Sequence, residues 1–241
     1  MIVLALDTAT SDLVVGLVDA SDEPRTIAES VTQTRAHNER LVPEVTRLLD
    51  QAGLGFGDLT AIVVGCGPGP FTGLRVGMAT AGAFGQALGI PVHGVVTHDA
   101  VASLIDAPTE RPVVVATDAR RKEIYWAKFV GGARVAGPSV TAPGDVDTRG
   151  AAVISVPEHL SPQLEVGEAT VTYVAPSPVG LARVADLDAE PAPLVPLYLR
   201  RPDAVPPKPA ARSAAIPAVD LGELREAAGV NHRGRDPGHG D

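Results

Sequence analysis

Residues 61–89, AIVVGCGPGPFTGLRVGMATAGAFGQALG, constrain the fold more than any other stretch of the chain. They begin with an apolar run rich in β-branched residues, Ala61 to Gly65, which is typical of a parallel strand covered on both faces. The following loop alternates glycine with proline, and this composition predicts a sharp, rigid turn. Thr72 has a side chain suited to a helix N-cap, so we expect a helix from there to Leu88.

Every fourth residue of this expected helix is small. Glycine costs up to ~1 kcal/mol relative to alanine inside a helix, so such a row needs a compensating contact. A stripe without bulk lets another backbone approach to the near end of the ~8–10 Å interaxial range. The sequence leaves open whether that backbone belongs to the protein's own core or to a partner chain. The row consists of Gly73, Gly77, Ala81 and Gly85.

The composition excludes several classes of protein. A net charge of -9 and a pI near 5.1 argue against a broad nucleic-acid-binding surface, which needs clustered Lys and Arg. The single cysteine, Cys66, rules out an intramolecular disulfide and fits a reducing compartment. The N-terminus, MIVLALDTAT, lacks the basic region of a signal peptide, and no apolar run has the length of a membrane span. We therefore expect a cytoplasmic protein with no membrane contact.

The hydrophobic pattern predicts a chain of strands and helices, with a candidate domain boundary at the linker 106–112. The expected division is an N-terminal lobe over 1–106, a C-terminal lobe over 107–201 and a largely disordered, proline-rich tail over 202–241. A helical turn is expected within the tail at Leu221 to Ala228. The strands expected from period-2 or continuous apolar runs are 2–6, 13–18, 26–31, 61–65, 91–96, 113–117, 124–130, 151–156 and 171–175. The other expected helices are 38–52, which contains Pro43, then 97–104, and 177–187, which Ser177 caps.

The search for catalytic motifs finds none. The Gly/Pro loop lacks the Gly-Lys-Ser/Thr ending of a P-loop, and Pro70 replaces the third glycine of a dinucleotide fingerprint. The histidines show no zinc-site spacing, so we expect no metal site and no cofactor. Cys66 can serve as a nucleophile only if His93 or His98 lies beside it, and we interpret it instead as a buried packing residue.

The turn of the first hairpin, residues 7–12, is rich in hydroxyl groups. Backbone amides and the side chains of Thr8, Thr10 and Ser11 can hold a phosphate there, and these residues are the weak candidates for cofactor binding. Threonine, serine and aspartate are also ordinary turn formers. The turn contains no glycine, which favours the structural interpretation.

Five segments together resemble the TsaB (YeaZ) family of tRNA threonylcarbamoyladenosine biosynthesis. The most specific is GPGPFTGLRVG at 67–77. The resemblance covers roughly residues 1–200 and leaves the tail outside. The other four segments are ALDTAT at 5–10, HNERLVP at 37–43, DARRKEIYWAKF at 118–129 and PLYLR at 196–200.

The resemblance implies an actin-like, sugar-kinase-like (ASKHA) fold of two α/β lobes and a non-catalytic role. In that family TsaB pairs with the catalytic paralogue TsaD, and the ATPase TsaE joins the complex. The complex places a threonylcarbamoyl group on the adenosine adjacent to the anticodon of tRNAs that read codons starting with A, so tRNA reaches TsaB through the complex. The sequence leaves open whether the isolated chain is a monomer or a homodimer. The family contact uses N-lobe helices, and the residues expected at the interface here are Leu41, Val45, Leu48, Gly73, Gly77, Ala81 and Gly85.

Three positions depart from the family pattern. Pro70 stands where serine is usual, Ser11 where an acidic residue is common and Lys122 where glycine is frequent. Pro70 removes a hydroxyl and an amide from the loop, which makes anion binding there less favourable. The alternative from another class is an actin-fold, ATP-dependent phosphotransferase, for which Asp7 and Asp118 are the metal-facing carboxylates.

Overall fold

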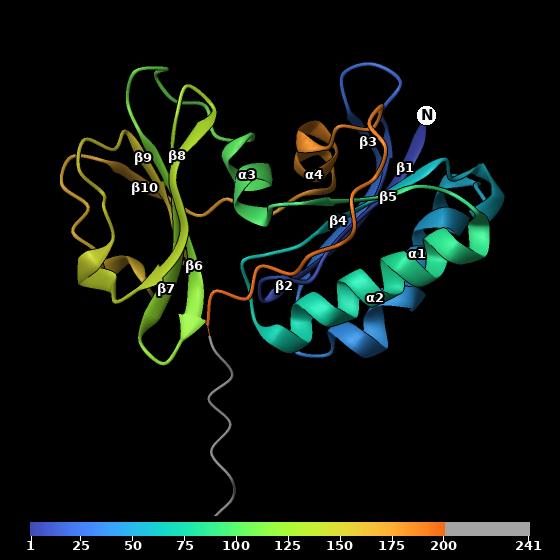
Figure 1. Ribbon diagram of the computed structural model, residues 1–241, viewed down its shortest axis with the longest axis horizontal. Coiled ribbons are helices and arrows are strands. Elements are labelled where there is room, and N and C mark those ends of the chain that lie inside the picture. The colour runs from blue at the N-terminus through green and yellow to red at the C-terminus, as the bar shows by residue number, and fades with distance from the viewer. Residues whose placement is uncertain (201–241) are drawn as a thin grey trace, which may run out of the picture. The chain divides into compact units, whose positions relative to one another are not determined.

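The computed structural model describes residues 1–200, which build two five-stranded sheets with helices on their faces (Figure 1). The first sheet has the order β3-β2-β1-β4-β5. The expected hairpin at the N-terminus is confirmed, because β1 and β2 pair antiparallel, whereas β1, β4 and β5 run parallel. The strands are β1 (Ile2–Asp7), β2 (Asp12–Asp19), β3 (Arg25–Gln33), β4 (Ala61–Gly65) and β5 (Val92–Val95).

Two long helices cover one face of this sheet and short helices cover the other. Alternate residues of β1 face opposite sides: Leu4 and Leu6 pack with α1 (His37–Ala52) and α2 (Phe71–Leu88). Val3 and Ala5 pack instead with residues of α3 (Thr97–Ala102) and α4 (Pro178–Val184). The first sheet is therefore buried on both faces, as the continuous apolar runs of β1 and β4 predict.

The second sheet has the order β10-β9-β6-β7-β8. The two mixed sheets confirm the expected α/β fold class, but β8 was not expected from the sequence. Its segment, ARVAGPSVT, carries Gly137 and Pro138, which interrupt the strand pattern. The strands are β6 (Val113–Arg120), β7 (Glu123–Val130), β8 (Ala133–Thr141), β9 (Val153–Ser155) and β10 (Thr170–Thr172), and single 3-10 turns lie at Phe56–Asp58, Pro143–Asp145 and Ser161–Gln163.

The helix ends follow the capping rules with one correction. Gly53 ends α1 in the left-handed conformation at φ 67°, and the hydroxyl of Ser177 accepts a hydrogen bond from the Gly180 amide, so the expected Ser177 cap is confirmed. The expectation that Thr72 caps α2 is wrong. The helix already begins at Phe71, and Pro70 occupies the cap position without a side-chain hydrogen bond. Thr72 therefore lies inside the first turn.

After the second sheet the chain returns to the first. α4 packs on β1 and β2, and the last described residues, orange in Figure 1, cross from the first sheet to the foot of β6. The expected C-terminal lobe, 107–201, thus includes a segment that packs on the first sheet, and the boundary near 106 stays a prediction. The predictions for 202–241, including the helical turn at 221–228, lie outside the described residues. Within residues 1–200, no helix is long and apolar enough to cross a membrane.

Candidate functional site

A threonine hydroxyl from the first hairpin enters the hydrogen-bond ladder of α2. Thr8 Oγ1 donates to the Gly73 carbonyl at 2.7 Å and accepts from the Gly77 amide at 3.1 Å. These two backbone groups pair with each other in a regular α-helix. A Cβ atom at Gly77 would lie 2.4 Å from Thr8 Oγ1, and one at Gly73 would lie 2.4 Å from the Thr8 carbonyl oxygen. The close backbone approach that the small row predicts is thus made by the chain's own hairpin turn.

The structure places all of the expected interface residues on the inner sides of α1 and α2. Gly85 follows Gly73 and Gly77 in facing its own chain, since a Cβ there would lie 2.2 Å from the Val92 side chain. In the folded chain these positions contact the protein's own residues. An inward and an outward stripe of small residues look alike in sequence. The remaining residues of the set, each at most 1% exposed in the core, are Leu41, Val45, Leu48 and Ala81.

The outward side of α2 carries a second i+4 row, which sequence reasoning missed. All five of its residues are exposed, and we call them the α2 ridge: Phe71, Arg75, Ala79, Ala83 and Ala87. Arg75 is the sole charged residue among the 18 of the helix. The ridge has the same four-residue spacing as the inner row and begins two positions earlier in the sequence. This spacing is the sequence feature that could have identified it. Beyond Phe71 and Arg75 at its start, this exposed row consists of alanines and carries no further charge.

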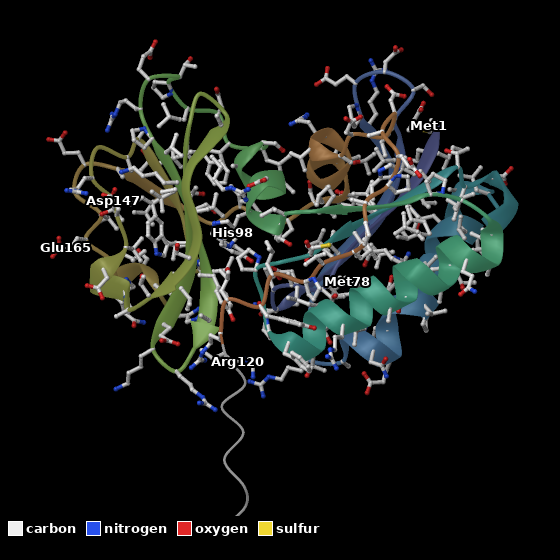
Figure 2. The ribbon with its side chains drawn as sticks, in the orientation of Figure 1. Met1, Met78, His98, Arg120, Asp147 and Glu165 are labelled. Atoms are coloured by element: carbon white, nitrogen blue, oxygen red, sulfur yellow. The ribbon has the colours of Figure 1, made fainter. Side chains whose placement is uncertain are left out.

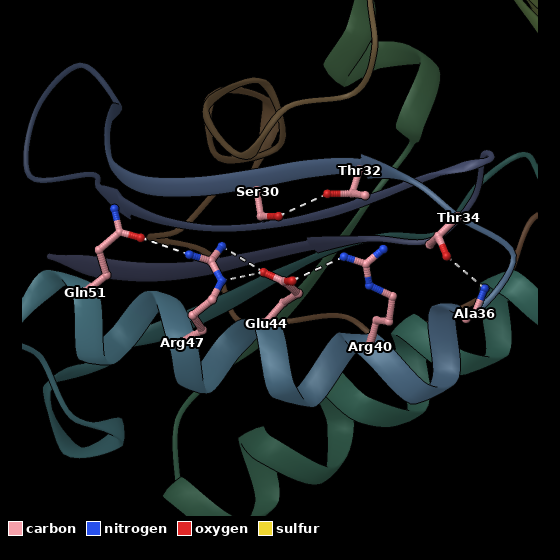
Figure 3. Close-up of polar contacts among 8 residues, drawn as sticks. All are labelled: Ser30, Thr32, Thr34, Ala36, Arg40, Glu44, Arg47 and Gln51. Carbon is pink, nitrogen blue, oxygen red and sulfur yellow. Dashed lines mark hydrogen bonds and ion pairs between the residues drawn. The ribbon is translucent and has the colours of Figure 1, made fainter.

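α1 carries more charge, and three of its charged side chains lie on the side toward β3 (Figure 3). Glu44 accepts a hydrogen bond from Arg47 Nε at 2.9 Å and lies 3.5 Å from Arg40 Nη2. Arg47 donates a further bond to Gln51 at 3.0 Å. The hydrogen bond from Arg47 holds the pKa of Glu44 below its usual value, even though partial burial acts in the other direction. Three charged residues of this helix are thus paired with one another along the helix.

A cleft of about 1160 Å³ opens between the first hairpin turn and the second sheet. All three weak cofactor candidates line it, together with Asp118 and Arg120. The Thr8 hydroxyl already makes its two bonds to α2, and Thr10 Oγ1 accepts from the Asp12 amide at 3.1 Å. Ser11 Oγ accepts from Gln33 Nε2 at 3.4 Å. Each hydroxyl thus has a partner within the protein: that of Thr8 lies in α2, and those of Thr10 and Ser11 lie in the first three strands.

The two carboxylates of the phosphotransferase alternative occupy different environments. Asp7 is fully buried and accepts from the Ala9 amide and the Thr97 hydroxyl, each at 2.7 Å, and burial raises its pKa to about 6. Asp118 lines the cleft and accepts from the Arg120 amide at 2.6 Å. Over residues 1–200, no group of three or more His, Cys, Asp or Glu side chains converges on a point where a metal ion can bind.

Cys66 is a packing residue, as expected. Its side chain lies in the core, 6% exposed, and burial raises the pKa of the thiol to about 11. His98 lies between the two sheets (Figure 2), and its Nε2 is 2.9 Å from the Thr117 hydroxyl. Burial lowers the pKa of His98 to about 3, so its ring is neutral at physiological pH. The thiol itself contacts the Val64 carbonyl oxygen at 3.7 Å.

The sequence matches a protein-family model and several known proteins. The family model for TsaD, tRNA N6-adenosine threonylcarbamoyltransferase, matches residues 27–185, more than half of the chain. An uncharacterized protein of Mycobacterium tuberculosis is 50% identical over 210 residues, which are 85% of this chain and 94% of that protein. An uncharacterized protein of Mycobacterium leprae is 51% identical, and the match covers 56% of its length.

The Escherichia coli protein named tRNA threonylcarbamoyladenosine biosynthesis protein TsaB is 33% identical over 132 residues, and the match covers 54% of this chain and 55% of that protein. The chain thus spans about half the length of the relatives named TsaB that it matches. The solved structure of YeaZ from Pseudomonas aeruginosa superposes with a TM-score of 0.62 at 27% identity, covering 76% of this chain and 89% of that chain. The expected actin-like fold is confirmed, and the chain belongs to the TsaD family, within its TsaB (YeaZ) group.

Proposed function

We propose that this chain is a non-catalytic accessory subunit of the complex that transfers a threonylcarbamoyl group to the adenosine adjacent to the anticodon of ANN-reading tRNAs. In this proposal the chain acts by pairing with a TsaD-type catalytic subunit, and tRNA reaches it through the complex. Family membership and the names of the TsaB relatives support the pathway. A TsaE-type ATPase as a further partner, a homodimer of the isolated chain and a cytoplasmic location belong to the same proposal.

The observation that carries the proposal is the exposed α2 ridge. Three of its five residues are alanine, which has no side-chain entropy to lose on binding. Side chains this short let a partner helix approach closely. Depletion of charge distinguishes the core of a protein interface from the rest of a surface, and Arg75 is the one charge on α2. We therefore place the partner contact on the outward side of α2 rather than on the inner row.

The first experiment is co-expression of this chain with the TsaD-type protein of its host, followed by light scattering of the purified product. The proposal expects a heteromer of defined mass, and an isolated chain that does not turn over ATP. A chain that stays separate from that protein while hydrolysing Mg-ATP would contradict the proposal and favour the phosphotransferase alternative.

A matched pair of variants locates the contact. Ala83→Glu places a charge on the α2 ridge and is expected to weaken the heteromer by about tenfold or more, because a carboxylate in an interface core loses its hydration. Val135→Glu places the same charge on β8, where the side chain is 58% exposed, and is expected to leave binding unchanged. Equal affinities for both variants would move the interface away from α2.

A further inference from the structure

Three exposed side chains from two distant segments form one cluster at the beginning of α2. The guanidinium of Arg75 lies over the ring of Phe71, 3.9 Å from its centroid. Arg75 Nε donates to the hydroxyl of Tyr198, 123 residues away, at 3.0 Å. The rings of Phe71 and Tyr198 are 4.9 Å apart. Phe71 is 47% and Tyr198 is 39% exposed, so solvent reaches the cluster although its members hold one another in place.

Tyr198 is fixed by the chain on both sides of it. The Leu197 amide donates to the Cys66 carbonyl at 2.9 Å, which ties the segment to the loop before α2. Arg200 donates to the Ala119 carbonyl at 3.1 Å and pairs with Glu123 at 3.1 Å, which ties it to the second sheet. The hydroxyl that orients Arg75 is therefore held by two lobes, and the cluster is ordered before any partner arrives.

Arg75 retains binding capacity after these contacts. Stacking on Phe71 fixes the plane of the guanidinium, and the bond to Tyr198 uses Nε alone. Within residues 1–200, no carboxylate forms an ion pair with Arg75, whereas Arg40 and Arg47 of α1 both pair with Glu44. A planar guanidinium with two free terminal nitrogens matches the two oxygens of a carboxylate.

We propose that Arg75 is the anchor of the partner contact and binds a carboxylate side chain of the TsaD-type subunit, with Tyr198 as its positioning residue. This inference rests on the proposed function, because it names the chemistry of the same interface. An acidic side chain bordered by apolar surface suits a lone arginine framed by two aromatic rings and continued by alanines. A nucleic-acid backbone fits less well, because it calls for clustered cations and α2 carries only one.

The test measures the affinity of the full chain for its host's TsaD-type protein by calorimetry at low and high salt. Arg75→Gln is expected to weaken binding by about tenfold or more and to reduce the salt dependence. Arg75→Lys is expected to restore little of that loss, because lysine lacks the planar fork. Arg149→Gln removes the same charge from a side chain that is 90% exposed in the second lobe and is expected to bind normally. Thermal unfolding of each variant checks that the fold is kept.

Tyr198→Phe tests whether Tyr198 positions Arg75 for binding or only stabilises the fold. It is expected to weaken binding by several-fold in the wild-type background and to have no further effect in the Arg75→Gln background, a coupling that a purely structural role would not produce. Equal affinities of wild type and Arg75→Gln would overturn the inference while leaving the proposed function standing. A wild-type chain that fails to bind would overturn both. Loss of self-association alone, or of RNA retention alone, on Arg75→Gln would assign the cluster to another occupant and overturn the inference.

Discussion

α1 and α2 lie side by side on one face of the first sheet, yet different contacts hold them there (Figure 1). α2 is fixed from inside: the Thr8 hydroxyl enters its backbone ladder, and its outward side is left nearly uncharged. α1 is held by an apolar stripe, and the Glu44 ion pairs lie beside that stripe, toward β3. The difference teaches that small residues serve two purposes on α2. The inner row admits the chain's own hairpin, and the outer row forms the exposed surface on which we propose the partner binds.

The largest expected effect is a change of folding stability with pH that comes from the buried carboxylate of Asp7. Burial raises the pKa of Asp7 to about 6, so the folded state binds its proton more tightly than the unfolded state does. Stability from this group is therefore greatest below about pH 4 and falls as the pH rises through 6, by about 3 kcal/mol in all. Asp7→Asn removes the titration. We expect its stability relative to wild type to rise by that amount between about pH 4 and pH 7 in urea unfolding. A difference that does not change with pH would contradict the assignment.

Two glycines of α2 test the inner row directly. Gly77→Ala is expected to destabilise the fold by about 2 kcal/mol or more, because its Cβ would overlap the Thr8 hydroxyl at 2.4 Å. Gly82 is the control in the same helix, since a Cβ there meets nothing within 4 Å. Gly82→Ala is expected to stabilise the protein by about 0.5–1 kcal/mol, as alanine normally does in a helix. Thermal unfolding measures both, and shifts of equal sign would break the comparison between the two sides of α2.

A third pair of variants tests the inserted hydroxyl itself. Thr8→Val keeps the shape of the side chain but leaves the Gly73 carbonyl and the Gly77 amide without that partner, at an expected cost of about 2 kcal/mol. Thr8→Ser keeps the hydroxyl and is expected to cost less. Denaturant unfolding of the two variants ranks them, and an equal loss in both would show that the methyl group rather than the hydroxyl matters.

The smallest effect is expected on α1. Arg47 holds the pKa of Glu44 below its usual value, so the stabilisation is present above the ordinary glutamate pKa and is lost as the pH falls through the lowered one. This sign is opposite to that of Asp7. Glu44→Gln is expected to cost less than about 1 kcal/mol at neutral pH and still less at high salt, because the pair is partly exposed. A larger or salt-independent loss in thermal unfolding would place Glu44 in the core of the fold.

Periodicity along the chain predicted most of the first lobe, because its strands and long helices bury continuous or amphipathic stripes. It missed β8, where Gly137 and Pro138 break the pattern. It also placed the expected interface on the inner row of α2, where the folded chain makes its own contacts. The row of α2 that faces inward is set by a contact with Thr8, which lies far away in the sequence. The local spacing of residues does not predict that contact. The same holds for Tyr198 and Arg75, whose pairing only the folded chain brings about.

The most direct measurement is the labelling rate of a cysteine on the α2 ridge with and without the TsaD-type partner. The native Cys66 does not interfere, since its thiol is buried with a pKa of about 11. We predict that saturating partner slows maleimide labelling of Ala83→Cys by about tenfold or more, because an interface core excludes solvent. Labelling of Val135→Cys on β8 should not change. Unchanged labelling of Ala83→Cys, in a complex that light scattering shows to be intact, would contradict the assignment of the α2 ridge as the partner-binding face.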